Sequence, residues 1–245
     1  MQQVQASSVA GSSVAQPKRE GTARERLGRK SPLRRMLSPP PPPPKWCAIS
    51  AGILIAGMGL LALLLVMGYR QHGWPAHYLQ DYQPGTWLSG GCLGLSALIC
   101  FGTARRCDSI RRRRFWVLAG ATLVIVSADD LLRLHEQLGA VIDSLATSYL
   151  GIATPLHAEN WIVASYGMVA LWYGWRRRNE LLRLPWTSYC LGAAFVLFCG
   201  MVAIDMAAGS ATIEESLKTI AALLIMIGCL AAYLSPELKE HARRG

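Results

Sequence analysis

The chain has 245 residues, of which 52% are hydrophobic, and its mean hydropathy is positive at +0.26. This composition excludes an ordinary soluble domain, and the long uncharged runs each approach the roughly 20 residues that a helix needs to cross a bilayer. The formal net charge of +10 is not accompanied by a basic surface interleaved with aromatic residues, so we expect no nucleic-acid partner.

Residues 1–45 are rich in Ser, Ala, Gln and Arg, and they include six consecutive prolines at 39–44. Such a segment cannot bury enough apolar surface to fold, so we expect a disordered basic tail with a stiff polyproline II stub. The proline run suits either a spacer or a segment that a partner domain binds. The following apolar run starts too late and is too long for a secretory signal, while the Arg-rich, acid-poor tail leaves a transit peptide as an alternative.

Six apolar segments follow the tail, and we interpret them as transmembrane helices. They cover approximately residues 46–69, 86–104, 115–134, 160–175, 186–208 and 213–234, of which the fourth is the shortest. Only helices and closed barrels satisfy their backbone groups in lipid. The sequence therefore predicts an all-α polytopic domain over residues 46–234, followed by a short tail at 235–245. Between the third and fourth spans, residues 140–150 suit an amphipathic helix lying on the membrane surface.

The basic residues are unevenly distributed along the chain. Of the 25 Lys and Arg residues, 22 lie in residues 1–45, the 105–114 connection, the 176–183 connection and the C-terminal tail. Cytoplasmic segments of membrane proteins carry an excess of Lys and Arg. We therefore expect both termini in the cytoplasm and the protein in the inner (plasma) membrane, with its basic segments near anionic lipid headgroups.

The segment Ser127–Gly139, SADDLLRLHEQLG, places ionisable side chains at the end of the third predicted span. An ionisable group at membrane depth costs about 3 kcal/mol on insertion scales and usually marks a function. Asp129 would lie about 21 Å along this span, inside a hydrocarbon core of ~30 Å. Asp205 ends the fifth predicted span, and Glu214 and Glu215 begin the sixth, so three helices bring carboxylates to one level.

Helical geometry divides the polar side chains of this segment. On one straight helix, Asp129, Arg133 and Glu136 form a single stripe, while His135 lies about 240° away from Asp129. A metal site therefore requires the helix to end near Leu134 or ligands to come from other helices. A hard cation needs only carboxylates, whereas zinc favours a histidine as well.

The leading hypothesis is a membrane protein that binds a cation or a divalent metal. If it is an enzyme, it would be a hydrolase that acts at the membrane surface. The metal ligands would be Asp129, Asp130, His135 and Asp205. Glu136 or Glu214 would then act as general base toward a metal-activated water.

Two other hypotheses stay open. In a small proton-linked carrier, Asp129 and Asp130 would be protonated alternately. In a non-catalytic scaffold or assembly protein, the acids would pair with Arg133 and Lys218 and only fix the helix packing. Here Lys218 would pair with Glu214 at i, i+4, and Thr212-x-x-Glu215 would form a capping box for the last span. The sequence does not predict an oligomeric state.

The pattern resembles a group of uncharacterised multi-pass bacterial membrane proteins in which a helix ends in an acidic pair followed by His-Glu. The resemblance rests on Asp129, Asp130, His135 and Glu136, with Glu214-Glu215-x-x-Lys218 as a second point. A looser similarity is to membrane hydrolases of the alkaline ceramidase and adiponectin-receptor type. That similarity implies zinc held by acids and histidines near one membrane face. This chain differs in having six predicted spans and no His-x-x-x-His on its last helix.

Overall fold

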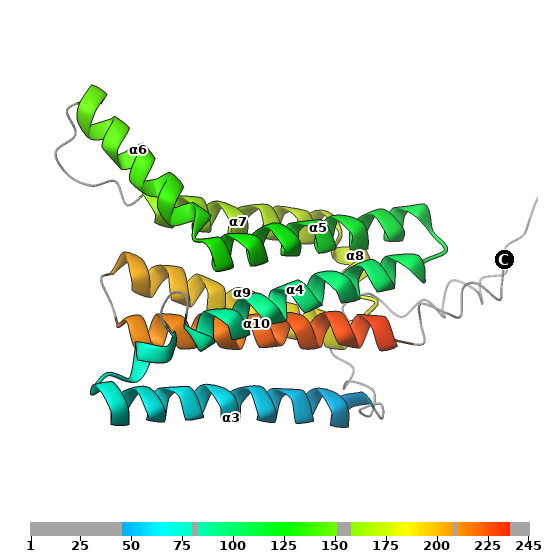
Figure 1. Ribbon diagram of the computed structural model, residues 1–245. Helices are drawn as coiled ribbons and strands as arrows, with labels where there is room; N and C mark the ends of the chain where they lie inside the picture. Colours follow the sequence, from blue (N-terminus) through cyan, green and yellow to red (C-terminus); the bar gives the residue numbers. More distant parts are fainter. Residues whose placement is uncertain (1–45, 80–82, 151–157, 208–209, 236–245) are drawn as a thin grey trace, which may run out of the picture. The chain divides into compact units, whose positions relative to one another are not determined.

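A computed structural model describes residues 46–79, 83–150, 158–207 and 210–235. The chain divides into two units, residues 1–41 and 42–245, and all described residues belong to the second. The predicted basic tail, its proline run and nearly all of the C-terminal tail lie outside the described residues. Within the described residues every regular element is a helix, which confirms the all-α class (Figure 1).

The helices follow one another along the chain with short connections. They are α3 (Trp46–His72), the 3-10 helix η1 (Pro75–Leu79), α4 (Pro84–Arg105), α5 (Ile110–Leu132), α6 (Leu134–Leu150), α7 (Ala158–Arg176), α8 (Arg178–Leu181), α9 (Pro185–Met206) and α10 (Ala211–Leu234). Within the described ranges, five helices are long and apolar enough to cross a membrane: α3, α4, α5, α9 and α10. The fourth predicted span corresponds to α7, a 19-residue helix that is not among them.

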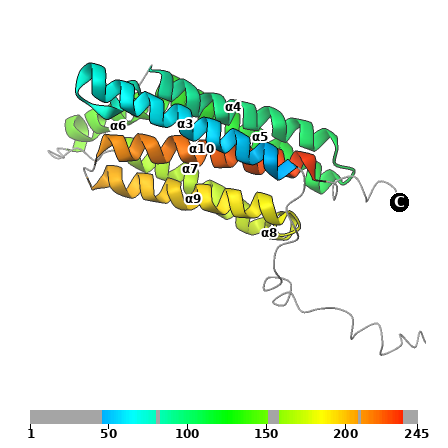
Figure 2. The ribbon, with the colours of Figure 1, turned by 90° about the horizontal axis from the view of Figure 1, so that it is seen from below.

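The last helix, α10, is the centre of the packing. It contacts α3, α4 and α9, while α4 packs on α5, and α7 packs on α6 and α9 (Figures 1 and 2). Small residues make these contacts close: Ala222 and Ala232 are buried on α10, and a Cβ on Gly57 of α3 would lie 2.7 Å from the Leu223 side chain. Close packing of small residues is the main source of helix association in lipid, where apolar surface gains little from burial between helices.

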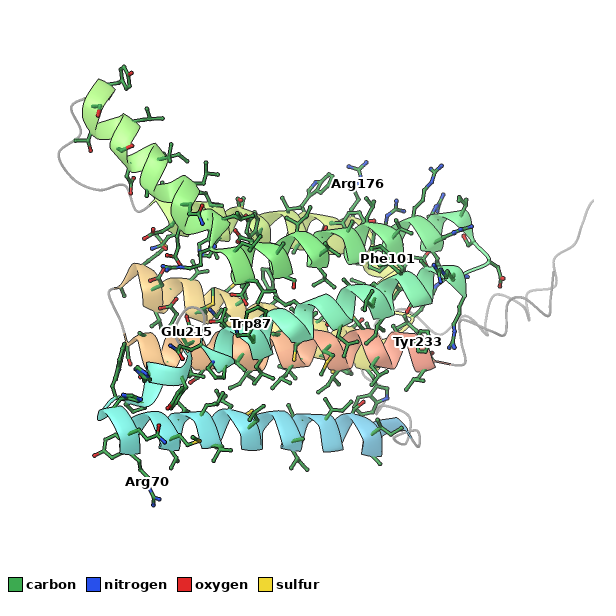
Figure 3. The ribbon with its side chains drawn as sticks, viewed as in Figure 1. Arg70, Trp87, Phe101, Arg176, Glu215 and Tyr233 are labelled. Atoms are coloured by element: carbon green, nitrogen blue, oxygen red, sulfur yellow. The ribbon has the colours of Figure 1, made fainter. Side chains whose placement is uncertain are left out.

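The arginine-rich connections gather at one end of the bundle. The Arg106 guanidinium, at the end of α4, lies 3.6 Å from the ring centroid of Tyr233 near the end of α10. Arg112 of α5 lies 3.6 Å from a carboxylate oxygen of Glu180 in α8, so the two basic connections contact each other. Figure 3 shows Tyr233 near the end of the bundle opposite Glu215.

The third predicted span does not continue as one straight helix through its polar segment. Helix α5 ends at Leu132, and Arg133 takes the left-handed conformation, with φ 54° and ψ 41°. Helix α6 then starts at Leu134 and leaves the bundle at an angle (Figure 1). The predicted amphipathic helix at 140–150 is therefore the second half of a longer helix, and its place on a membrane surface stays a prediction.

Candidate functional site

A cavity of about 360 Å³ lies among α5, α6, α7, α9 and α10, toward the end of the bundle where α9 ends and α10 begins. Its lining includes all six residues that the metal hypothesis names: Asp129, Asp130, Glu136, His135, Asp205 and Glu214. The structure therefore brings the predicted site residues to one place. Their roles as metal ligands or as general bases stay predictions.

The helix break at Arg133 joins His135 to Asp129. The backbone N–H of His135 donates to Asp129 Oδ1 at 2.7 Å, and the ring Nδ1 lies 2.9 Å from Asp129 Oδ2. Arg133 ends α5 through a bond from its N–H to the Asp129 carbonyl and starts α6 by accepting from the N–H of Gln137. His135 would lie far around a straight helix from Asp129, but the helix is not straight: α5 ends at Leu132, close to the end near Leu134 that a shared site requires. The left-handed Arg133 redirects the chain and brings His135 onto Asp129.

The Asp129 carboxylate is buried, with 4% of the residue exposed. Besides His135, the Tyr166 side chain of α7 lies in the same cavity lining. In a neutral histidine whose Nδ1–H donates to a carboxylate, Nε2 carries the lone pair. His135 lines the cavity, so this pair provides a proton acceptor there, or a metal ligand whose orientation a carboxylate fixes.

The second aspartate belongs to a separate network across three helices. Asp130 accepts a hydrogen bond from Ser89 Oγ of α4 at 2.6 Å, and its other oxygen lies 3.3 Å from Lys218 Nζ of α10. Lys218 also pairs with Glu215 at 2.7 Å. These side chains are largely withdrawn from solvent, so the lysine compensates two carboxylates inside the bundle.

Two expectations of the scaffold hypothesis change in detail. Lys218 pairs with Glu215 on its own helix, one residue beyond the predicted partner Glu214. Helix α10 begins at Ala211, with Ser210 as its N-cap, so the capping box predicted at Thr212-x-x-Glu215 is wrong. The N-cap lies two residues earlier than that pattern requires.

Arg133 forms an ion pair within its own turn. Its Nε donates to Glu136 Oε1 at 2.8 Å, and its terminal nitrogen donates to the other carboxylate oxygen of the same residue. Both side chains are about one-third exposed. This pair closes the first turn of α6 beside the cavity.

Two carboxylates of the cavity have no partner within the described ranges. Asp205, at the end of α9, and Glu159, in the first turn of α7, have no ion pair or hydrogen bond among the residues that the structure describes. Sequence reasoning placed Asp205 in the site, and it left Glu159, just before the fourth predicted span, as either a ligand or a helix cap. It missed Tyr166, although its spacing of seven residues from Glu159 puts both on one helix face. Nothing in the sequence pointed to Ser89.

The cavity lining is strongly acidic. Among the described residues it contains one lysine and one histidine against seven carboxylates: Asp129, Asp130, Glu136, Glu159, Asp205, Glu214 and Glu215. Clefts lined by one sign of charge attract ions of the other sign. Carboxylate oxygens suit hard cations, but within the described ranges no three His, Cys, Asp or Glu side chains are arranged to hold a metal ion. Asp129 and Asp130 would have to leave their present partners to bind one.

The comparisons with known proteins identify the family and little more. Residues 48–233 match the model of a domain of unknown function, DUF8692, so the chain belongs to this family. No curated protein and no solved structure matches the chain. The similarity to the alkaline ceramidase and adiponectin-receptor type of hydrolase therefore gains no support from them.

Proposed function

We propose that this family member is an integral membrane protein that binds a cation in the acidic cavity among α5, α6, α7, α9 and α10. The excess of carboxylates over basic groups in the cavity lining carries the proposal. A carboxylate withdrawn from water and left unpaired is expensive. A bound cation would compensate Asp205 and Glu159, for which the described part of the chain shows no ion pair or hydrogen bond.

The proposed orientation has six spans, with both termini in the cytoplasm at the inner membrane. Helix α7 would be a span in addition to α3, α4, α5, α9 and α10. Its 19 residues extend about 28 Å at 1.5 Å per residue, which is close to the thickness of the hydrocarbon core. The arginine-rich end would face the cytoplasm and its anionic lipid headgroups. The Arg178 guanidinium lies 4.6 Å from the Trp175 ring centroid there, and amphipathic aromatic rings favour the membrane interface.

A divalent metal is the most specific form of this proposal. Its ligands would be Asp129, Asp130, His135 and Asp205, and Glu136 or Glu214 would accept a proton. A metal bound there would supply a nucleophilic water for hydrolysis at the membrane surface. The Asp129–His135 pair supports this form, because its 2.9 Å contact brings two of the four ligands together.

A proton-linked carrier is the second candidate. The contacts of Asp130 favour the carrier, since its carboxylate binds both Ser89 and Lys218. Protonation of Asp130 would break its ion pair with Lys218 and leave the lysine paired with Glu215 only. Alternating protonation of this kind is common where acids lie inside membrane proteins. Proton or solute flux in liposomes that survives the double Asp129→Asn, Asp130→Asn change would contradict this mechanism.

Calorimetry on the purified protein in lipid nanodiscs tests cation binding. Ca²⁺, Mn²⁺, Zn²⁺ and methylammonium are titrated separately, with empty nanodiscs as background. We expect at least one of these cations to bind, and Asp205→Asn to weaken that binding by tenfold or more. Asp108→Asn removes a negative charge in the exposed connection between α4 and α5, so this variant is the matched control and should leave the binding unchanged.

If none of these cations binds the parent protein, the proposed function is wrong. The acids would then serve only to pair with Lys218 and Arg133, as the scaffold hypothesis holds. Zn²⁺ or Mn²⁺ binding that is lost in both Asp129→Ala and His135→Ala would favour the metal form.

A further inference from the structure

The cavity lining changes from polar to apolar along α10. Its first lining residues are Ala211, Glu214, Glu215 and Lys218, and the later ones are Ala221, Ala222 and Ile225. At 1.5 Å per residue, the lining from Glu214 to Ile225 extends about 16 Å along the helix. The cavity therefore reaches well beyond the acidic group, toward the middle of the bundle.

On three other helices the cavity lining also changes from polar to apolar toward the middle of the bundle. On α9, Asp205 lies at the helix end, and the lining continues inward with Val202, Met201 and Phe198. On α5, Val126 lies one turn inside the two aspartates, and on α7, Val163 lies one turn inside Glu159 and Asn160. Four helices thus give one cavity with an acidic end and an apolar end.

The uncompensated charge lies at the acidic end only. Asp129 is engaged by His135, Asp130 and Glu215 by Lys218, and Glu136 by Arg133. Asp205 and Glu159 have no such partner among the described residues. A bare metal ion would satisfy these charges but would leave the apolar lining of α9 and α10 without an occupant.

The size of the cavity indicates what fills the remainder. At about 30 Å³ for each water-sized group, 360 Å³ holds about a dozen non-hydrogen atoms. Small-molecule sites in proteins start near 300 Å³ and are mostly apolar with a few placed polar groups. This cavity fits that description, with its polar groups confined to one end.

We infer that the cavity binds an amphiphilic amine, a ligand with a single ammonium group and an apolar chain of up to about ten carbons. This inference rests on the proposed function and specifies its ligand. The ammonium group lies beside Asp205 and Glu159, and the chain extends between α9 and α10 toward Phe198 and Ile225. A zwitterionic phospholipid headgroup is excluded, because its phosphate would lie among the carboxylates.

Affinity as a function of chain length tests the inference. The protein in nanodiscs is titrated with methyl-, butyl- and octylammonium, and binding to empty nanodiscs is subtracted. Each buried methylene should tighten binding about three- to fourfold until the cavity is full. Octylammonium should bind at least tenfold more tightly than 1-octanol, and octanoate should not bind.

Two variants separate the ends of the cavity. Asp205→Asn should weaken methylammonium and octylammonium binding alike, by tenfold or more. Val202→Thr keeps the side-chain shape but makes the wall polar, so it should weaken octylammonium severalfold and leave methylammonium unchanged. Val196→Thr, on the same helix but exposed and outside the cavity, is the matched control and should change neither.

The outcomes are distinct. Equal affinity for methylammonium and octylammonium would overturn this inference and leave cation binding intact. Octanol binding as tightly as octylammonium would also overturn it, since the carboxylates would then contribute nothing. If no ammonium ion and no inorganic cation binds, the inference and the proposed function fail together.

Discussion

Arg133 is where a single residue changes the arrangement of the site. It is the only non-glycine residue with a positive φ in the described ranges, and it ends one helix and begins the next. A left-handed conformation costs a residue with a Cβ roughly 1–2 kcal/mol. Here the turn is held by the Glu136 ion pair and by the two hydrogen bonds from His135 to Asp129.

Substitution of Arg133 separates its backbone role from its charge. Arg133→Ala should destabilise the protein slightly, since it keeps the backbone strain and loses a partly exposed ion pair worth about 0–1 kcal/mol. Arg133→Gly loses the same pair but relieves the strain, so we expect it to be more stable than Arg133→Ala by up to about 1 kcal/mol. Thermal unfolding of both variants in one detergent measures the difference, and an Ala variant as stable as the Gly variant would contradict it.

Lys218 should contribute more to stability than Arg133, because its partners are less exposed. Lys218→Ala leaves Asp130 and Glu215 without their cation, which we expect to cost about 2 kcal/mol, below the 3–5 kcal/mol measured for fully buried pairs. Lys218→Arg keeps the charge and should recover most of the loss. The unfolding temperatures of the two variants measure this, and equal values would show that charge is not what Lys218 supplies.

At the scale of the elements, the position of α6 depends on its contact with α7. A Cβ on Gly139 would lie 2.6 Å from the backbone nitrogen of Glu159, so only glycine allows this approach. The contact places the first turn of α6, with His135 and Glu136, beside the start of α7. Two walls of the cavity therefore depend on one missing methyl group.

Gly139→Ala should separate the two helices and destabilise the protein by about 1–3 kcal/mol, as overpacking does elsewhere. Gly91→Ala is the matched control, since a Cβ there meets nothing within 4 Å and the helix position favours alanine by about 0.5–1 kcal/mol. We expect the Gly139 variant to unfold at a lower temperature and to bind the cation more weakly. The opposite order of the two unfolding temperatures would contradict the close contact.

At the scale of the whole helical unit, opposite charges occupy opposite ends of the bundle. The cavity and its acids lie where α9 ends and α10 begins, and Arg106 lies on Tyr233 near the other end of α10 (Figure 3). Arg112 pairs with Glu180 there, which joins the two basic connections. This separation gives an orientation in the membrane if basic segments face the cytoplasm. The side of each terminus then depends on whether α7 crosses.

Location of the two termini distinguishes six spans from five. With α7 as a span, epitope tags at the N- and C-terminus should both be protected in sealed right-side-out vesicles. With only α3, α4, α5, α9 and α10 crossing, one tag should be accessible and the other protected. A cysteine placed at Ser148 of α6, in a cysteine-free variant, should be labelled from outside, and labelling only from inside would reverse the proposed orientation.

Much of the fold and the membership of the site follow from the sequence alone. Apolar length predicts the helices, and the depth of Asp129, Asp205 and Glu214 along their spans predicts that they converge. Apolar length and depth along a span depend only on the order of residues in the chain, so they can be predicted without knowing how the helices pack. The separation of basic from acidic segments can also be read directly from residue positions.

Only the tertiary structure decided which polar groups pair. Neither the left-handed turn at Arg133 nor the choice of Glu215 over Glu214 as partner for Lys218 is encoded in helical periodicity. The same holds for Ser89, which reaches Asp130 from another helix. Such pairings depend on helix rotation and on approaches of a few ångströms, such as that at Gly139. Because small residues on several helices set those approaches together, the sequence determines where the polar site lies, and packing determines its connections.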